Sequence, residues 1–137
     1  MKRIVTGMLV LLMLALAGCG GEVSVTATVP IPDITISPVL SGLHYGWTSG
    51  GTILAGTVDF TALSADLDTM TIVVSNDSGR EVSRTTTDLR GYQGSEGGFI
   101  DFAIDTISFP WGRYTFTLYV VDWLGHYSNP VYGDFII

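Results

Sequence analysis

Side chains that could carry out chemistry are few in this sequence of 137 residues. His44 and His126 are the only histidines, so an imidazole base would have to be one of them. Asp122, His126 and Ser128 lie within one short segment, and a hydrolase needs an acid, a base and a nucleophile of these types. Residues this close in a hairpin loop rarely reach triad geometry, so we expect His126 to be a loop histidine without a catalytic role. The sequence therefore predicts that the protein is not an enzyme, with a hydrolase as a distant alternative.

Other patterns of catalytic or cofactor chemistry are absent from the sequence. It contains no Gly-rich phosphate loop, no Cys and His cluster with metal-ligand spacing and no dinucleotide fingerprint. Asp101 and Asp105 fall on one face of an expected strand, where a rise of about 3.3 Å per residue separates them by about 13 Å. That separation is too large for a cooperating acid and base. We expect both carboxylates to be solvated.

Three carboxylates could bind a metal ion. Asp66 and Asp68 lie in an expected loop at residues 63–68, and Asp122 begins another at residues 122–130. Both loops are expected at the same end of the molecule. Carboxylate and carbonyl oxygens are the ligands that calcium prefers, so calcium is a candidate cofactor. Because Asp is also an ordinary turn residue, the main expectation is that no cofactor is bound.

Aromatic side chains gather in the loop at residues 122–130. Trp123, His126 and Tyr127 could contact a carbohydrate or a protein, because flat rings offer contact area at a low entropic cost. The other interpretation, which we favour, is that Trp123 folds back and caps the core. Trp111 is expected at the opposite end of the molecule.

The elements that position these residues have an apolar period of two. Several short runs alternate between apolar and polar residues, and no ten-residue stretch after the N-terminal segment has a convincing helical repeat. Strands are predicted at residues 34–37, 53–62, 69–75, 80–87, 100–105, 113–121 and 131–137. Asn76-Asp77-Ser78-Gly79 is predicted to be a turn, because Gly79 accepts a positive φ without steric cost. Seven short strands separated by turns predict an all-β antiparallel sandwich.

Cys19 is the only cysteine. It ends a segment that contains two positive charges at Lys2 and Arg3, an unbroken apolar run at residues 8–17 and then small residues. This order is typical of a secretory signal peptide. As a helix, the apolar run would cover only about half of the roughly 30 Å hydrocarbon thickness of a bilayer. We therefore do not expect a transmembrane anchor.

The stretch Leu16-Ala17-Gly18-Cys19 resembles the lipobox of bacterial lipoproteins. This resemblance covers the N-terminal segment only and implies that residues 1–18 are a cleaved lipoprotein signal peptide. It also implies that Cys19 carries several acyl chains such as palmitate, since one chain holds a protein only marginally at a membrane. Gly20, in place of Asp, favours the outer membrane of a host that has one, on its periplasmic or surface side. An ordinary signal peptide that leaves an idle thiol is the alternative.

The mature chain is predicted to combine a tether with one domain. Residues 19–37 hold the lipidated N-terminus, the tether and the strand predicted at 34–37, and residues 38–137 hold the sandwich. Val and Ser/Thr alternate at residues 22–29, which fits a tether or an extra edge strand. We favour the tether.

Charge and cysteine content narrow the range of functions. The chain has a formal net charge of −7, and loss of Lys2 and Arg3 leaves four arginines against thirteen acidic side chains, a balance of −9. An anionic surface repels phosphate backbones, so no nucleic-acid partner is expected. Once the single cysteine is acylated, no disulfide can form, so we expect the core alone to stabilise the domain.

The segment Gly112-Arg113-Tyr114-Thr115-Phe116 resembles the start of strand F in immunoglobulin-like domains. In such domains a tyrosine two residues before a core position ties the corner through its hydroxyl. Val120-Val121-Asp122, Gly125 and Ser128-Asn129-Pro130 resemble the F strand and F to G turn of bacterial immunoglobulin-like and fibronectin type III-like envelope modules. The resemblance covers about residues 38–137 and implies an immunoglobulin-like β-sandwich. The tryptophan and disulfide pair of antibody domains is missing.

These observations predict a lipid-anchored envelope protein that presents one immunoglobulin-like module for protein interaction or structural support. Its expected partners are the membrane, through the acyl chains on Cys19, and an envelope protein or polysaccharide. The alternative function is a surface carbohydrate-binding or adhesin domain that uses the loop at residues 122–130.

Overall fold

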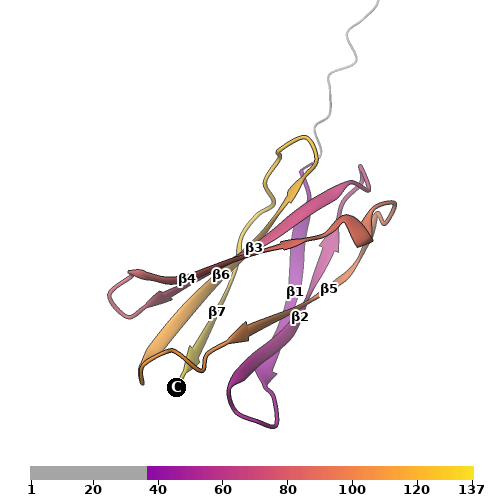
Figure 1. Cartoon of the computed structure of the whole chain (residues 1–137). Coiled ribbons are helices and arrows are strands. Elements are labelled where there is room, and N and C mark those ends of the chain that lie inside the picture. Colours follow the sequence, from indigo (N-terminus) through magenta and orange to yellow (C-terminus); the bar gives the residue numbers. More distant parts are fainter. Residues whose placement is uncertain (1–36) are drawn as a thin grey trace, which may run out of the picture. The chain divides into compact units, whose positions relative to one another are not determined.

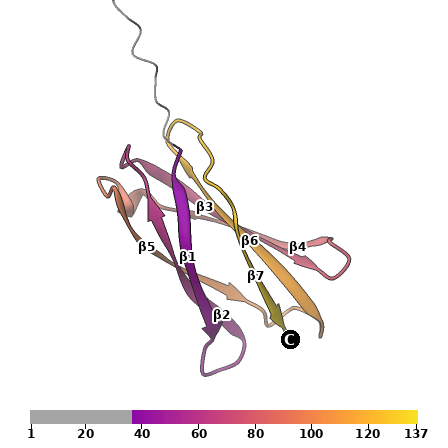
Figure 2. The same cartoon turned by 180° about the vertical axis from the view of Figure 1, so that it is seen from behind.

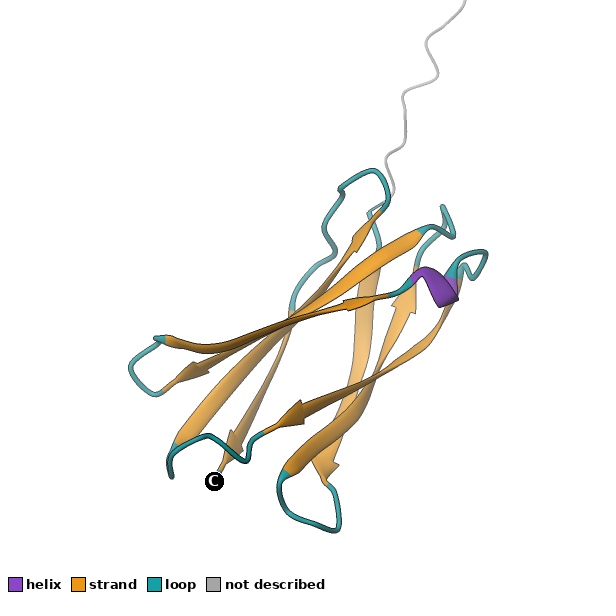
Figure 3. Ribbon diagram, in the orientation of Figure 1, coloured by secondary structure: helices purple, strands orange, loops and turns teal. Residues whose placement is uncertain are grey.

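The computed structural model describes residues 37–137, which form two antiparallel sheets joined by short loops (Figure 1). The strands are β1 (Val39–Trp47), β2 (Ile53–Thr61), β3 (Leu67–Asn76), β4 (Glu81–Asp88), β5 (Gly97–Asp105), β6 (Arg113–Asp122) and β7 (Val131–Ile136). One turn of 3₁₀ helix, Arg90–Tyr92, precedes β5 (Figure 3). The predicted signal peptide, Cys19 and residues 22–29 lie outside the described residues. Within residues 37–137, no helix has the length and apolar character needed to cross a membrane.

The seven strands are divided three and four between the sheets. One sheet has the order β1-β2-β5 and the other has the order β4-β3-β6-β7. In constant-type immunoglobulin domains the fourth strand belongs to the sheet of the first two strands, whereas here β4 joins β3 in the other sheet. The fold is an immunoglobulin-like β-sandwich. The predicted fold class is confirmed.

The core lies between the sheets and follows the alternation seen in the sequence. Every second residue of β6 is buried, and the same alternation holds along β5. The buried side chains of these two strands are Tyr114, Phe116, Leu118, Val120, Ile100, Phe102 and Ile104. The ring of Phe116 lies 5.6 Å from that of Phe102 in the opposite sheet. Each side chain buried in this way stabilises the fold by about 1.5–3 kcal/mol before ordering costs.

The corner before β6 has the hydrogen bond that the resemblance to immunoglobulin-like domains implied. The hydroxyl of Tyr114 donates to the carbonyl of Pro110 at 2.7 Å. The ring of Tyr114 is stacked on Phe135 of β7, with 5.4 Å between centroids. This side chain therefore joins the loop, the core and the last strand.

The strand β1 is not among those predicted from the sequence. Residues 34–36 of the strand predicted at 34–37 lie outside the described residues, Ser37 is not in a strand, and β1 begins at Val39. Most residues of β1 are exposed, and its register shifts between Ser41 and His44, next to Gly42 at a φ of 53°. The bulge and the exposure leave β1 without the alternation of apolar and polar residues that predicts a strand.

The two long sides of the sandwich are closed to different degrees. On the side of β1 and β7, the N–H of Leu40 donates to Oδ1 of Asn129 at 2.8 Å, and Nδ2 of Asn129 donates to the carbonyl of Leu40 at 2.9 Å. The Tyr45 hydroxyl likewise donates to the carbonyl of Asp134 and accepts from its N–H, both at 3.0 Å. Figure 2 shows the start of β1 at the same end as the β6–β7 loop. On the other side, β4 and β5 are the edges of different sheets and do not pair.

Candidate functional site

The predicted contact loop follows β6 and is folded around the carboxylate of Asp122, which is buried. Oδ1 of Asp122 accepts hydrogen bonds from the N–H groups of Leu124 at 2.9 Å and His126 at 2.8 Å. Its Oδ2 lies 2.8 Å from Nδ1 of His126. The N–H of Asp122 also donates to the carbonyl of His126 at 3.1 Å. These bonds hold the loop in one conformation.

Two opposing effects act on the pKa of Asp122. Burial raises the pKa, because it penalises the charged carboxylate. The N–H and imidazole of His126, together with the N–H of Leu124, favour the charged form. The hydrogen bonds and the charge of His126 outweigh burial, so the pKa lies below its usual value of 3.8. Asp122 is therefore ionised at neutral pH.

The loop exposes a group of large side chains. Trp123 is 56% exposed, Leu124 72% and Tyr127 65%. His126 is half-buried against Asp122. The structure thus brings the three predicted contact residues to one loop, with Trp123 and Tyr127 open to solvent.

The interpretation that we favoured for Trp123 is wrong, because its side chain does not cap the core. The N–H of Trp123 donates to the carbonyl of Asp66 at 3.1 Å, which fixes the backbone on the neighbouring loop. The chain then winds around the carboxylate of Asp122, and the indole remains exposed.

Ser128 does not complete a triad with Asp122 and His126. Its side chain is buried, and its Oγ donates to the carbonyl of Asn129 at 2.8 Å while accepting from the N–H of Val120 at 3.0 Å. A serine nucleophile would have to donate to the imidazole. The pair of Asp122 and His126 therefore braces the loop, and Ser128 fastens it to β6.

The loops at residues 63–68 and 122–130 meet at one end of the sandwich, as predicted. Leu67 is paired with Asp122, and the bond from Trp123 to Asp66 joins the two loops. This proximity does not assemble the predicted calcium ligands.

Each aspartate of the predicted calcium set is placed differently. Both side-chain oxygens of Asp122 are bonded within its own loop, and Asp66 accepts a hydrogen bond from the hydroxyl of Ser64. Asp68 is half-buried near the start of β3. Among residues 37–137, no three His, Cys, Asp or Glu side chains are grouped in a way that could hold a metal ion.

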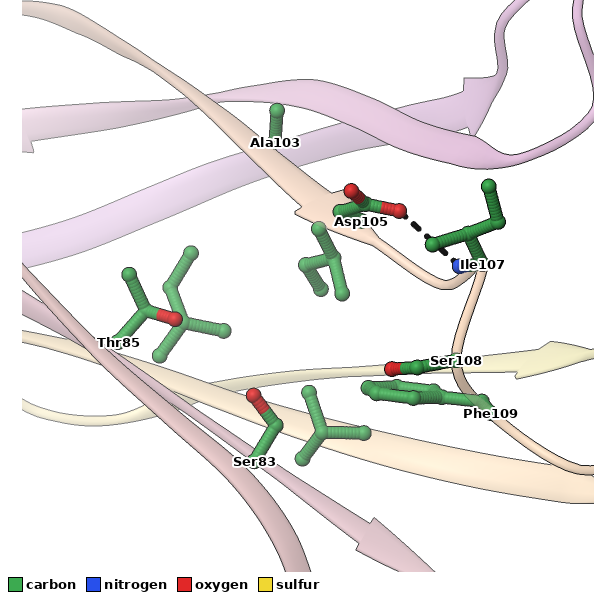
Figure 4. Close-up of a pocket in the computed structure, with 10 residues that line it drawn as sticks. Ser83, Thr85, Ala103, Asp105, Ile107, Ser108 and Phe109 are labelled. Carbon is green, nitrogen blue, oxygen red and sulfur yellow. Dashed lines mark hydrogen bonds between the residues drawn. The ribbon is translucent and has the colours of Figure 1, made fainter.

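A second candidate site, which the sequence did not indicate, lies on the open side between β4 and β5. Two adjoining cavities of about 240 and 400 Å³ share Ile72, Thr85 and Ala103 in their walls. We call this pair of cavities the β4–β5 groove. Figure 4 shows Ser83 and Thr85 on one side of it, with Ala103 and Asp105 on the other.

Hydroxyl groups line the β4 side of the groove where a covered sheet would have apolar residues. In the β3–β4 ladder, Ser83, Thr85 and Thr87 are opposite Val74, Ile72 and Met70. Residues directly opposite in a sheet share a face, so these hydroxyls lie on the core side. Val74, Ile72 and Met70 are buried, whereas Thr85 and Thr87 are exposed. Buried apolar side chains therefore form the floor of the groove, and hydroxyl groups form its β4 wall.

The β5 side of the groove is an edge with free backbone groups. The N–H of Thr106 donates to Thr52 at 2.9 Å, and the N–H of Ala62 donates to Glu96 at 2.8 Å. Hydrogen-bonded and non-bonded pairs alternate along an antiparallel ladder. It follows that the even-numbered residues of β5 bond to β2, while the N–H and C=O groups of Asp101, Ala103 and Asp105 face outward from the sheet edge.

One signal in the sequence could have revealed the groove. The segment Glu81–Asp88 is polar on both faces, with Ser83, Thr85 and Thr87 at a spacing of two. A strand that buries neither face is uncovered, which places it at an edge. The position of β5 across the groove could not be predicted from this pattern, because it depends on which sheet β4 joins.

Comparisons with known proteins agree on the architecture. No family model matches the sequence, and no curated protein is detectably similar to it. The structure is similar to part of OgpA from Akkermansia muciniphila, with a TM-score of 0.56 and 9% identity over 73% of this chain. The matched part is 27% of OgpA, so this chain corresponds to about a quarter of that protein. At this identity the likeness shows the fold alone.

Two weaker likenesses have TM-scores below 0.5. A family 76 glycoside hydrolase from a bovine Bacteroides thetaiotaomicron strain gives a TM-score of 0.49 at 20% identity, over 72% of this chain and 20% of the hydrolase. A DUF3244 family protein with an immunoglobulin-like β-sandwich fold from Bacteroides vulgatus gives 0.35 at 18% identity, over 73% of this chain and 98% of that one.

Proposed function

We propose that this chain is a lipid-anchored envelope protein whose β-sandwich binds an extended strand of a partner protein in the β4–β5 groove. The observation that carries the proposal is the free edge of β5 beside the groove. An added strand would pair its backbone with the outward groups of Asp101, Ala103 and Asp105, and its alternate side chains would fill the groove. Strand addition of this kind takes affinity from main-chain hydrogen bonds and specificity from side-chain pockets.

The charges on β5 favour a basic partner strand. Asp101 and Asp105 are both exposed on the outer face of the edge. Cations at matching positions of an added strand would face these carboxylates, and opposite charges across a strand pair are stabilising. Antiparallel pairing of two copies about Ala103 would instead set Asp101 of one copy against Asp105 of the other. A heterologous partner is therefore favoured over a second copy.

A nine-residue peptide centred opposite Ala103 tests the proposal. In Thr-Val-Lys-Val-Thr-Val-Lys-Val-Thr, the valines would cover the groove floor and the lysines would face Asp101 and Asp105. We expect the labelled peptide to bind the full-length protein in detergent, measured by fluorescence anisotropy. N-methylation of the central Thr removes a donor that faces β5 and should weaken binding by about tenfold. N-methylation of a central Val, whose N–H faces away, should have a much smaller effect.

A matched pair of variants tests the same edge from the protein side. Ala103→Pro removes the outward N–H of residue 103 while leaving the ladder between β5 and β2 intact, as proline is tolerated on edge strands. Ala103→Thr keeps that N–H. The proposal requires Ala103→Pro to lose the peptide and Ala103→Thr to retain it. Equal binding by both variants, or equal binding of a peptide with Glu in place of Lys, contradicts the proposal.

The membrane anchor in this proposal is supported by the sequence. The stretch Leu16-Ala17-Gly18-Cys19 after a short apolar run has the order of a lipoprotein signal. The acidic mature chain would not adsorb to anionic headgroups by charge, so acyl chains on Cys19 would provide the membrane contact. Outer-membrane sorting follows from Gly20 in the same resemblance.

One observation favours carbohydrate binding as a second candidate function. Trp123 is exposed on a loop that Asp122 and His126 hold in place, and a fixed indole offers a flat face to a sugar ring. Neutral polysaccharides should then change the tryptophan fluorescence of the protein, and Trp123→Ala should abolish the change. A response that persists in Trp123→Ala would remove this loop as a sugar site.

A further inference from the structure

A third cavity lies at the opposite end of the sandwich from the loop at residues 122–130. It has a volume of about 400 Å³ and is lined by the β3–β4 turn, Val82 and residues 110–114. Figure 1 and Figure 2 both show the β3–β4 turn and the start of β6 on the side away from the start of β1. Trp111 is 90% exposed, more than any other exposed large hydrophobic side chain of the described residues. An aromatic ring held so far out of the core is a candidate contact surface.

The turn that carries Trp111 is fixed on both sides. Before it, the carbonyl of Pro110 accepts the hydroxyl of Tyr114. After it, the N–H of Gly112 donates to the carbonyl of Ile137 at 3.2 Å, and the N–H of Ile137 donates back to Gly112 at 3.0 Å. The indole is therefore presented by a backbone that need not be ordered when a ligand binds, which lowers the entropic cost of binding.

The facing wall is held by Asn76. Oδ1 of Asn76 accepts from the N–H of Ser78 at 3.2 Å, the hydroxyl of Ser78 at 2.7 Å and the N–H of Arg80 at 3.0 Å. Gly79 has the positive φ of 76° that closes this turn. Both walls of the cavity are thus preformed.

The arginines that line this cavity indicate a negatively charged ligand. Of the four arginines among residues 37–137, two are paired with carboxylates, as Arg84–Glu81 and Arg90–Asp88. Within residues 37–137, Arg80 and Arg113 have no ion pair, and both line this cavity together with a single carboxylate, that of Asp77. The two arginines of the described residues that lack an ion pair therefore line the same cavity of an otherwise acidic protein. A guanidinium group matches a carboxylate in geometry and charge.

We propose that this cavity binds an acidic sugar residue, with its carboxylate at Arg80 and Arg113 and one face of its ring against Trp111. Contact with the sugar ring would explain why the indole of Trp111 is exposed. Binding of the carboxylate would explain why Arg80 and Arg113 have no ion pair. A simple inorganic anion would use the arginines but not Trp111, and a neutral sugar would use Trp111 but not the arginines. This site is separate from the β4–β5 groove, so a negative result at one site leaves the proposal for the other unaffected.

Trigalacturonic acid and its fully methyl-esterified form provide matched probes, because they share the sugar rings and differ in charge. We expect the acid to bind the full-length protein in detergent, measured by calorimetry, and the ester to bind at least about tenfold more weakly. Binding of the acid should also weaken as salt is added.

Two pairs of variants assign the binding to this cavity. Trp111→Ala and Arg113→Gln should each weaken binding of the acid by about tenfold or more. Tyr132→Ala removes another exposed aromatic ring and Arg84→Gln removes a paired arginine, and both should bind as the unmodified protein does. Equal affinity for acid and ester, unchanged binding in Trp111→Ala and Arg113→Gln, no binding of the acid, or tighter binding of an Asp-rich peptide would each overturn the proposal.

Discussion

His126 and Asp122 are bound to each other across the base of the β6–β7 loop, with 2.8 Å between Nδ1 and Oδ2. The carboxylate also accepts the N–H groups of Leu124 and His126, so one buried side chain organises the loop. Removing it would leave those N–H groups without their acceptor.

We therefore expect Asp122→Ala to lower the free energy of unfolding by about 1–3 kcal/mol, the usual cost of leaving buried polar groups unpaired. Urea denaturation followed by circular dichroism measures the change. Asp101→Ala, which removes an exposed carboxylate, is the control and should change stability little. A loss as small as that of the control would show that the loop is held by other contacts.

Asp122 should also make the free energy of unfolding depend on pH in the acidic range. Because its pKa is lower in the folded protein than the usual 3.8, its contribution is complete above that value and is lost as the pH falls below it. The difference in unfolding free energy between the unmodified protein and Asp122→Asn should shrink as the pH is lowered through this range. A difference that stays constant would contradict the assigned shift.

Tyr114→Phe isolates the bond from the tyrosine hydroxyl to Pro110 while keeping the ring in the core. We expect a loss of about 1 kcal/mol, typical of one hydrogen bond. Tyr132→Phe is the control, since Tyr132 is exposed on β7. Thermal or chemical unfolding of the two variants would separate the corner bond from a general effect of losing a hydroxyl.

Gly133 allows the ring of Phe116 to lie directly against β7. A Cβ atom at this position would be 2.5 Å from two ring atoms of Phe116, whereas a Cβ at Gly46 would have open space around it. Gly133→Ala should lower stability by about 1–3 kcal/mol through overpacking, and Gly46→Ala should cost less. In the Gly133→Ala background, Phe116→Leu should cost less than it does alone, because the smaller side chain relieves the overlap.

Cys19→Ser tests the lipid anchor. The unmodified protein should partition into the detergent-rich phase after cloud-point separation of a cell extract, and Cys19→Ser should move to the aqueous phase. Ser24→Ala leaves the cysteine in place and should behave as the unmodified protein does. Retention of Cys19→Ser in the detergent-rich phase would mean that something other than acyl chains holds the protein.

The parts of the fold that were predictable are those in which one strand buries one face. In β6, the alternation of Tyr114 and Phe116 with polar residues shows which face is buried, so the strand could be predicted locally. The hydrogen bond at its corner was expected from the resemblance of residues 112–116 to immunoglobulin-like domains. β1 could not be predicted, because its bulge at Ser41 breaks the alternation and its residues are mostly exposed.

The candidate sites depend on contacts that the local sequence does not contain. The exposure of Trp123 follows from hydrogen bonds to Asp122 and Asp66. The alternation of apolar and polar residues along the sequence gives no information about these bonds. The β4–β5 groove requires knowing that β4 joins β3 in the four-stranded sheet. Arg80 and Arg113 are 33 positions apart in the chain and come together only through the β3–β6 pairing, which sets Asn76 opposite Tyr114.

The start of β1 beside Asn129 also has a mechanical consequence. The described chain begins at this end, and Trp111 lies at the other end. Tension between the proposed acyl anchor at Cys19 and the ligand proposed at Trp111 would run nearly parallel to the strands. Hydrogen bonds between antiparallel strands lie across that direction. The β1–β2 ladder would then be sheared with all its bonds sharing the force, instead of being unzipped one bond at a time.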